Sequence, residues 1–103
     1  MNKSKELQHI PVVKAYCIVV PVSGTSICRF FYGLFDGPKG VANYPVTWEK
    51  AGSKWLGTVP DKTYACQYQD QEQARQSATF LNEIMGRLDT PNHPGCFITE
   101  WYA

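Results

Sequence analysis

The pattern of apolar and polar residues predicts two β-hairpins before residue 62. Residues 12–22, VVKAYCIVVPV, are rich in β-branched side chains, which favour strands. The turn residues SGTS separate this run from residues 27–35, ICRFFYGLF, so we expect the two runs to pair as a hairpin. Residues 42–61 repeat the arrangement, with Trp48 and Trp55 on either side of the turn sequence EKAGSK. The first part of the chain therefore predicts an antiparallel sheet.

The strongest periodic signal predicts a helix at residues 71–88. Asp70 is a good N-cap, and Gln73 lies three residues later, as in a capping box. Apolar residues recur at helical spacing and form one stripe, which consists of Ala74, Ala78, Leu81, Ile84, Met85 and Leu88. A helix with a single apolar stripe can cover only one face of a sheet.

The remaining segments complete an α+β fold. Residues 62–68, KTYACQY, predict a short strand or an extended approach to the helix, and residues 96–103, CFITEWYA, predict a final strand. We expect an antiparallel sheet of four to five strands, two hairpins plus the C-terminal strand, with the helix at 71–88 packed on one face. The length of 103 residues predicts a single domain, 1–103, in which the polar residues 1–11 form a flexible N-terminal arm.

The strand predicted at residues 27–35 has two faces, and only one of them carries a charge. Phe30, Tyr32 and Leu34 make the uncharged face, which we expect to lie under the helix. The charged face then points away from the helix, on the same side of the sheet as one face of the neighbouring strand. The expected partner-binding patch on this open face is aromatic and basic, and it consists of Lys14, Tyr16, Arg29, Phe31 and Phe35. Such a mixture is typical of a protein–protein contact. The alternative is that loops or the N-terminal arm cover the patch.

The charge balance disfavours nucleic acid as the leading partner. Ten Lys and Arg residues face nine Asp and Glu residues, so the net charge of +1 exerts little long-range attraction on phosphates. The run RFFYGLF does not meet the RNA-recognition motif, which has glycine after the basic residue, because Phe30 follows Arg29. A nucleic-acid-binding domain that uses Lys14, Tyr16, Arg29 and Phe31 is therefore the alternative prediction.

The sequence offers little chemistry for catalysis or metal binding. It contains none of the common phosphate-loop, zinc-protease or hydrolase motifs. His93 lies three residues before Cys96, a spacing found in metal half-sites, but no CxxC pair completes the site. We therefore expect no metal, no cofactor and no enzymatic activity.

The sequence contains four cysteines, Cys17, Cys28, Cys66 and Cys96. Each lies in or beside an apolar run, which favours buried free thiols over two disulfides.

These features together predict a small cytoplasmic protein-binding domain. No apolar run approaches the ~20 residues that span a bilayer, so we expect no membrane partner. The surplus of rings, with three Trp, six Tyr and five Phe, favours binding of another protein, or of a second copy as a homodimer, through the open sheet face. Small chains of this character are frequent among regulators and inhibitors, including those of phages and mobile elements. An enzyme or a small-ligand carrier ranks third.

Overall fold

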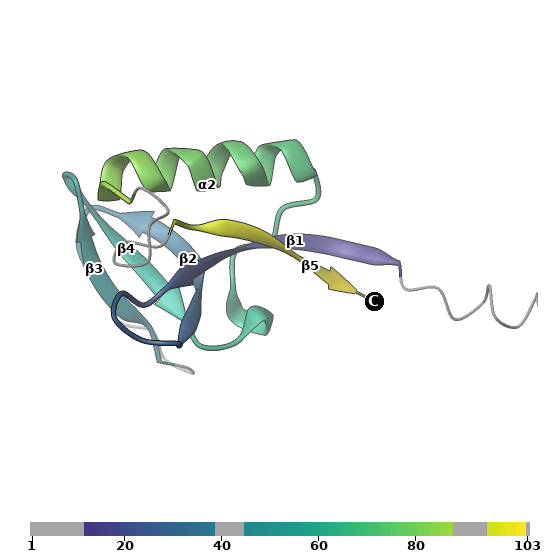
Figure 1. The fold of residues 1–103 in the computed structure, drawn as a ribbon, viewed down its shortest axis with the longest axis horizontal. Coiled ribbons are helices and arrows are strands. Elements are labelled where there is room, and N and C mark those ends of the chain that lie inside the picture. Colours follow the sequence, from purple (N-terminus) through teal and green to yellow (C-terminus); the bar gives the residue numbers. More distant parts are fainter. Residues whose placement is uncertain (1–11, 39–44, 88–94, 103) are drawn as a thin grey trace, which may run out of the picture.

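The fold is a five-stranded antiparallel sheet with one α-helix on one face (Figure 1). The computed structural model describes residues 12–38, 45–87 and 95–102. In chain order its elements are β1 Val13–Pro21, β2 Cys28–Phe35, β3 Thr47–Ala51, β4 Lys54–Val59, the 3₁₀ turn η1 Lys62–Tyr64, α2 Gln71–Met85 and β5 Phe97–Tyr102. The expected α+β class, with two hairpins, a C-terminal strand and one covering helix, is confirmed.

The strands are arranged in the order β3-β4-β2-β1-β5. The hairpins β1–β2 and β3–β4 are joined through the pairing of β2 with β4, and β5 pairs with β1. The pairing of β1 with β2 is short, because it extends only from Val19–Phe30 to Pro21–Cys28. Beyond this point the two strands separate, and a later segment of the chain enters between them.

The segment after η1 fills the space between β1 and β2. The backbones of Tyr16 and Tyr68 exchange two N–H···O bonds of 2.8 Å, and the Cys66 N–H donates to Phe31 O at 2.9 Å. The stretch predicted as a short strand or extended approach is thus a 3₁₀ turn followed by a single bridge. Figure 1 shows the chain rising from η1, on one side of the sheet, to α2 on the other.

The helix begins and ends at residues that favour its termini. The Asp70 side chain accepts a bond of 3.1 Å from Glu72 N–H, which confirms the predicted N-cap. Gly86 has φ 66°, the left-handed conformation that ends many helices, so α2 stops at Met85 and not at residue 88. Leu88, the last member of the predicted stripe, lies outside the described residues. Of the other stripe members, Ala74, Ala78 and Leu81 are buried.

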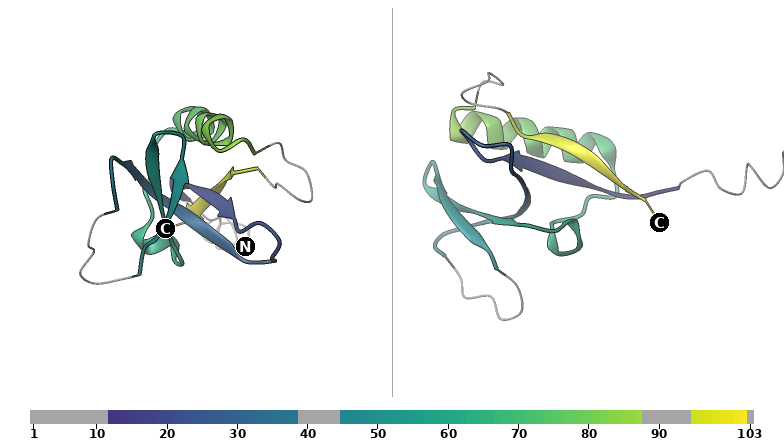
Figure 2. Two further views of the ribbon diagram at one scale, coloured as in Figure 1. Left: turned by 90° about the vertical axis from the view of Figure 1, so that its left-hand side faces the viewer. Right: turned by 60° about the horizontal axis from the view of Figure 1, so that its bottom comes forward.

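The main core lies between α2 and the sheet. Ile18, Phe31 and Leu56 from three strands pack in one cluster with Ala78 and Leu81 of the helix. A second and smaller cluster lies on the opposite face of the sheet, where Cys17, Val59 and Ala65 are buried together with the half-buried residues Phe30, Tyr32, Val46 and Trp101. The end-on view in Figure 2 shows α2 on one side of the sheet only. The face away from α2 is called the open face below.

A β-bulge in β2 exchanges the two faces of that strand. Phe31 pairs with Thr58 and Gly33 with Gly57, which leaves Tyr32 as the extra residue. Before the bulge, Phe31 faces α2 and Phe30 the open face; after it, Leu34 faces α2 and Phe35 the open face. The expectation that Phe30 and Tyr32 lie under the helix is therefore wrong, whereas that for Leu34 is confirmed.

A second bulge lies in β1. Val13 pairs with Tyr102 and Ala15 with Trp101, so Lys14 is the extra residue there. Ile18 and Val20 lie in the main core against α2. Tyr16 lies two residues before Ile18 and faces the same side, so its predicted position on the open face is wrong. Within the described residues, no helix is long and apolar enough to cross a membrane.

Candidate binding surface on the open sheet face

The structure separates the five predicted partner-binding residues onto two faces. Phe35 and Lys14 lie on the open face, where Phe35 contacts Trp48 and the Lys14 ammonium lies over the Trp101 ring. Tyr16 is half-buried on the helix side. Phe31, with 7% of its surface exposed, belongs to the main core and is not available to a partner.

Arg29 also lies on the helix side, because it pairs with Val20 of the main core. Its Nε donates to Thr58 Oγ1 and its Nη2 to Thr58 O, both at 2.9 Å. Assigning the charged face of this strand to the open side was therefore wrong. The charge is accommodated on the helix side by Thr58, a polar residue with 4% of its surface exposed.

Four rings form a continuous group on the open face, which we call the aromatic patch: Tyr32, Phe35, Trp48 and Trp55. Phe35 is at the centre, with its ring centroid 5.9 Å from that of Tyr32 and 5.5 Å from that of Trp48 in an edge-to-face contact. Trp55 pairs directly with Phe35 across β2 and β4. All four rings are half-buried, so each keeps part of its surface open to solvent.

Two glycines make room for the rings. Gly33 and Gly57 face each other across β2 and β4, and the rings lie directly on them. A Cβ atom added at Gly57 would be 3.0 Å from the Trp48 ring and 3.2 Å from the Tyr32 ring; one at Gly33 would be 2.8 Å from the Phe35 ring. Because aromatic side chains commonly cover glycines in sheets, this packing fixes the inner side of the patch and leaves its outer side for contact.

Two lysines lie over rings of the open face, one at the aromatic patch and the other at Trp101 on β5. The Lys50 Nζ lies 5.1 Å from the centre of the Trp55 ring, and the Lys14 Nζ lies 4.9 Å from the centre of the Trp101 ring. Both distances are in the range of cation–π attraction. Lys54, next to Trp55 in sequence, forms an exposed ion pair of 2.6 Å with Asp36. Lys50 is thus the lysine that lies directly on a ring of the aromatic patch.

Of the five residues predicted from the sequence, Lys14 and Phe35 lie on the open face as expected, whereas the placement of Tyr16, Arg29 and Phe31 there was wrong. The sequence-based prediction placed Trp48 in the second hairpin without assigning it to the patch, and it did not consider Lys50 there. The available signal was the pair of glycines, Gly33 and Gly57, each in a strand that also carries large rings.

The thiols are free and differ in exposure. Cys17 and Cys96 are buried, Cys66 is half-buried and Cys28 is exposed, so the expectation of buried thiols does not hold for Cys28. Burial raises the pKa of both the Cys17 and the Cys96 thiols above their ordinary value. These two groups are thus held as unreactive thiols.

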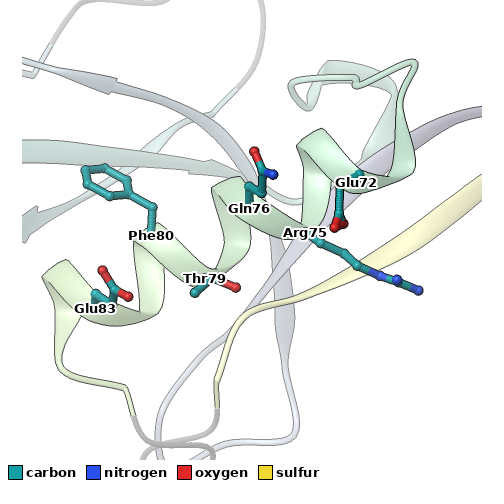
Figure 3. A pocket seen from close by; sticks show the side chains of 6 residues that line it. All are labelled: Glu72, Arg75, Gln76, Thr79, Phe80 and Glu83. Carbon is teal, nitrogen blue, oxygen red and sulfur yellow. The ribbon is translucent and has the colours of Figure 1, made fainter.

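No metal site is present in the part of the chain that the structure describes, where no three His, Cys, Asp or Glu side chains gather. His93, the residue considered with Cys96, lies outside the described residues. A shallow depression on the solvent side of α2 is lined by one helix alone, through Glu72, Arg75, Gln76, Thr79, Phe80 and Glu83 (Figure 3). Because none of its lining residues comes from a second element, we assign no ligand to it.

Fold and surface together define a class: an α+β domain that has, in the described residues, one α-helix on one side of an antiparallel sheet and a partly exposed aromatic patch with Lys50 at its edge on the other. Comparison of the chain with protein-family models, curated proteins and solved structures finds no match.

Proposed function

We propose that the chain is a non-enzymatic domain that binds another protein through the aromatic patch. The observation that carries the proposal is the position of Tyr32, Phe35, Trp48 and Trp55: they form one group on the face without a helix, and each is partly open to solvent. Tyr, Trp and Phe are enriched at the centres of protein interfaces, where they supply most of the binding energy.

The lysine at the patch indicates the chemistry of the partner. Lys50 lies over the Trp55 ring and is exposed to solvent. A partner with an acidic side chain beside its apolar ones would match an apolar surface with a lysine at its edge. We therefore propose a partner with an apolar and acidic contact surface. A small chain of this kind would act as a regulator or inhibitor by occupying a larger protein.

A single-stranded nucleic acid is the second candidate, because lysines beside aromatic rings also suit bases and phosphates. Two features favour a protein. The Phe35 and Trp48 rings pack edge to face, so they do not offer parallel faces for stacking, and the net charge is only +1.

The four free thiols suit a reducing compartment, so we propose the cytoplasm as the place of action.

Site-specific photo-crosslinking in cells tests this proposal. A photoreactive phenylalanine analogue replaces Trp55 in one variant and Phe80 in a matched control, since Phe80 is an exposed ring (51%) on the opposite side of the molecule. We expect a discrete protein adduct from position 55 and none from position 80. A second copy as the captured protein would identify a homodimer. Equal adducts from both positions, or adducts to nucleic acid only, would refute a protein partner at the patch.

A further inference from the structure

The outer edge of β5 is the less protected of the two edges of the sheet. β5 ends the strand order, so among the described residues no strand lies on its outer side. Its sequence, FITEWY, contains one charged residue and neither lysine nor proline, whereas β3 at the other end carries Glu49 and Lys50. Charges and prolines are common protection for free edges. Phe97 and Tyr102, at the two ends of β5, also keep 51% and 47% of their surface exposed.

The hydrogen bonds of β1 determine which backbone groups of β5 point to this edge. Tyr16 exchanges both of its backbone bonds with Tyr68, on the side of β1 away from β5. Its partner on β5, Glu100, therefore belongs to a pair without mutual hydrogen bonds. Because the two kinds of pair alternate along an antiparallel ladder, the N–H and C=O groups of Ile98 and Glu100 point outward, away from β1.

Cys96 agrees with this direction. It precedes Ile98 by two residues, and both of its backbone groups bond to the Asn82 amide of α2 and not to β1. Among the described residues, the outward groups of Ile98 have no hydrogen-bond partner, and those of Glu100 have only a long bond of 3.4 Å, from Lys62 Nζ to Glu100 O. The edge therefore offers two consecutive outward-facing residues for pairing with a further strand.

A groove of about 280 Å³ lies between α2 and the start of β5. From α2 it is lined by Arg75, Ala78, Thr79 and Asn82, which recur at helical spacing, and from the strand by residues 96–98. Since Asn82 bonds to the outward groups of Cys96, the groove lies beside the outer edge of β5. A strand paired with this edge would therefore have the groove along one of its faces.

Arg75 supplies a positive charge at the groove. It is exposed, and Figure 3 shows its side chain extending from α2 on the side of β5. Among the described residues, no ion pair joins Arg75 to a carboxylate. An acidic side chain on a strand at this edge would give it a partner of opposite charge.

We infer that the outer edge of β5 binds an extended segment of another protein, which adds a strand to the sheet and places an acidic side chain at Arg75. Pairing with Ile98 and Glu100 supplies main-chain hydrogen bonds, and the groove accepts an apolar side chain of the segment, as in other cases of β-strand addition. A second copy suits this edge less well. Two-fold pairing of β5 with itself would bring a second α2 to the same face, where the first α2 already reaches the edge through Asn82.

Selection from a random peptide library displayed on phage, with the parent protein as bait, tests the inference. We expect enriched peptides in which an acidic residue lies near β-branched or aromatic residues, since the segment must be extended and must match Arg75. Fluorescence anisotropy of an enriched peptide labelled with fluorescein then gives its dissociation constant. Enrichment of no peptide, or of basic peptides, would overturn the inference.

Methylation of single backbone amides in β5 locates the contact. A synthetic peptide of residues 96–103, ligated to the rest of the chain at Cys96, carries the methyl group. On Ile98 it replaces an outward N–H, so the fold should persist and the selected peptide should bind at least about tenfold more weakly. On Thr99, which pairs with Cys17 of β1, the same change is the matched control and should destabilise the fold. Loss of the fold on methylation of Ile98, or unchanged affinity, would contradict the assignment.

Charge reversal tests the role of Arg75. Arg75→Glu should weaken binding of the selected peptide at least about tenfold, because attraction becomes repulsion. Lys50→Glu, the same change at the aromatic patch, is the matched control and should stay within about twofold, which separates this edge from the contact proposed on the open face. Equal losses in the two variants would refute the site. So would a dimer of the parent protein that dissociates on methylation of Ile98, because the occupant would then be a second copy.

Discussion

At the scale of single residues, burial determines which cysteines can react. Cys17 has no exposed surface and Cys96 has 7%, whereas Cys28 is exposed at the start of β2. Because burial disfavours the thiolate, the pKa values of the Cys17 and Cys96 thiols lie above the ordinary value, and less thiolate is present at a given pH. Reactivity of the native protein should therefore be concentrated at the exposed thiol.

We predict that iodoacetamide at pH 8 modifies Cys28 at least about tenfold faster than Cys17 or Cys96, because only thiolates react. Peptide mass spectrometry over a time course measures the three rates, and the urea-unfolded protein, in which the rates should become similar, is the control. The raised pKa values of these two thiols in the folded state also fix how the free energy of unfolding changes with pH. The contribution of the two thiols to stability is complete below their unfolded-state pKa and is lost as pH rises through their folded-state pKa. Equal native rates would contradict the buried positions.

Single residues also explain why only part of the predicted patch lies on the open face. Strict alternation places Phe31 and Phe35 on one face, but the extra residue Tyr32 puts them on opposite faces. Lys14 shifts the start of β1 in the same way. A bulge is set by how a strand pairs with its neighbour, here β4 and β5, and this pairing leaves no periodic signal in the strand itself.

At the scale of elements, α2 is tied to β5 by one side chain. The Asn82 amide accepts a bond of 2.6 Å from Cys96 N–H and donates one of 3.1 Å to Cys96 O. Asn82 thus provides Cys96 with the two backbone bonds that a neighbouring strand would provide. This contact fixes the helix beside the edge strand, over the main core.

We predict that Asn82→Ala lowers the free energy of unfolding by about 2–4 kcal/mol, because two buried backbone groups of Cys96 lose their partners. Urea denaturation followed by circular dichroism measures the change. Gln76→Ala, an exposed position on the same helix, is the control and should stay within about 0.5 kcal/mol of the parent protein. A loss no larger than that of the control would show that the Asn82 contact does not secure the helix.

The elements themselves were largely predictable from sequence. The hairpins follow from β-branched runs separated by turn residues, and the helix follows from its apolar stripe and the Asp70 N-cap. The predicted extension to residue 88 was wrong because Gly86 adopts the left-handed conformation that ends α2. The insertion of residues 66–68 between β1 and β2 was not predictable, since it depends on the separation of two strands distant in sequence from this segment.

At the scale of the whole molecule, the two faces of the sheet differ in how far the described chain covers them. The helix covers the main core, and Ala65 after η1 is buried in the smaller cluster with Cys17 and Val59. The rings over β2, β4 and β3 remain partly open, and Lys50 lies over one of them.

The affinity of the patch for the protein captured from position 55 tests the central proposal most directly. Isothermal titration calorimetry compares the parent protein with two variants, Trp55→Ala and Phe80→Ala. Phe80 is an exposed ring on α2, on the helix side of the sheet. If the aromatic patch is the contact, Trp55→Ala raises the dissociation constant at least about tenfold, as expected when a tryptophan of the contact surface is removed, while Phe80→Ala stays within about twofold. An unchanged dissociation constant for Trp55→Ala, in a variant that remains folded, would contradict the proposal.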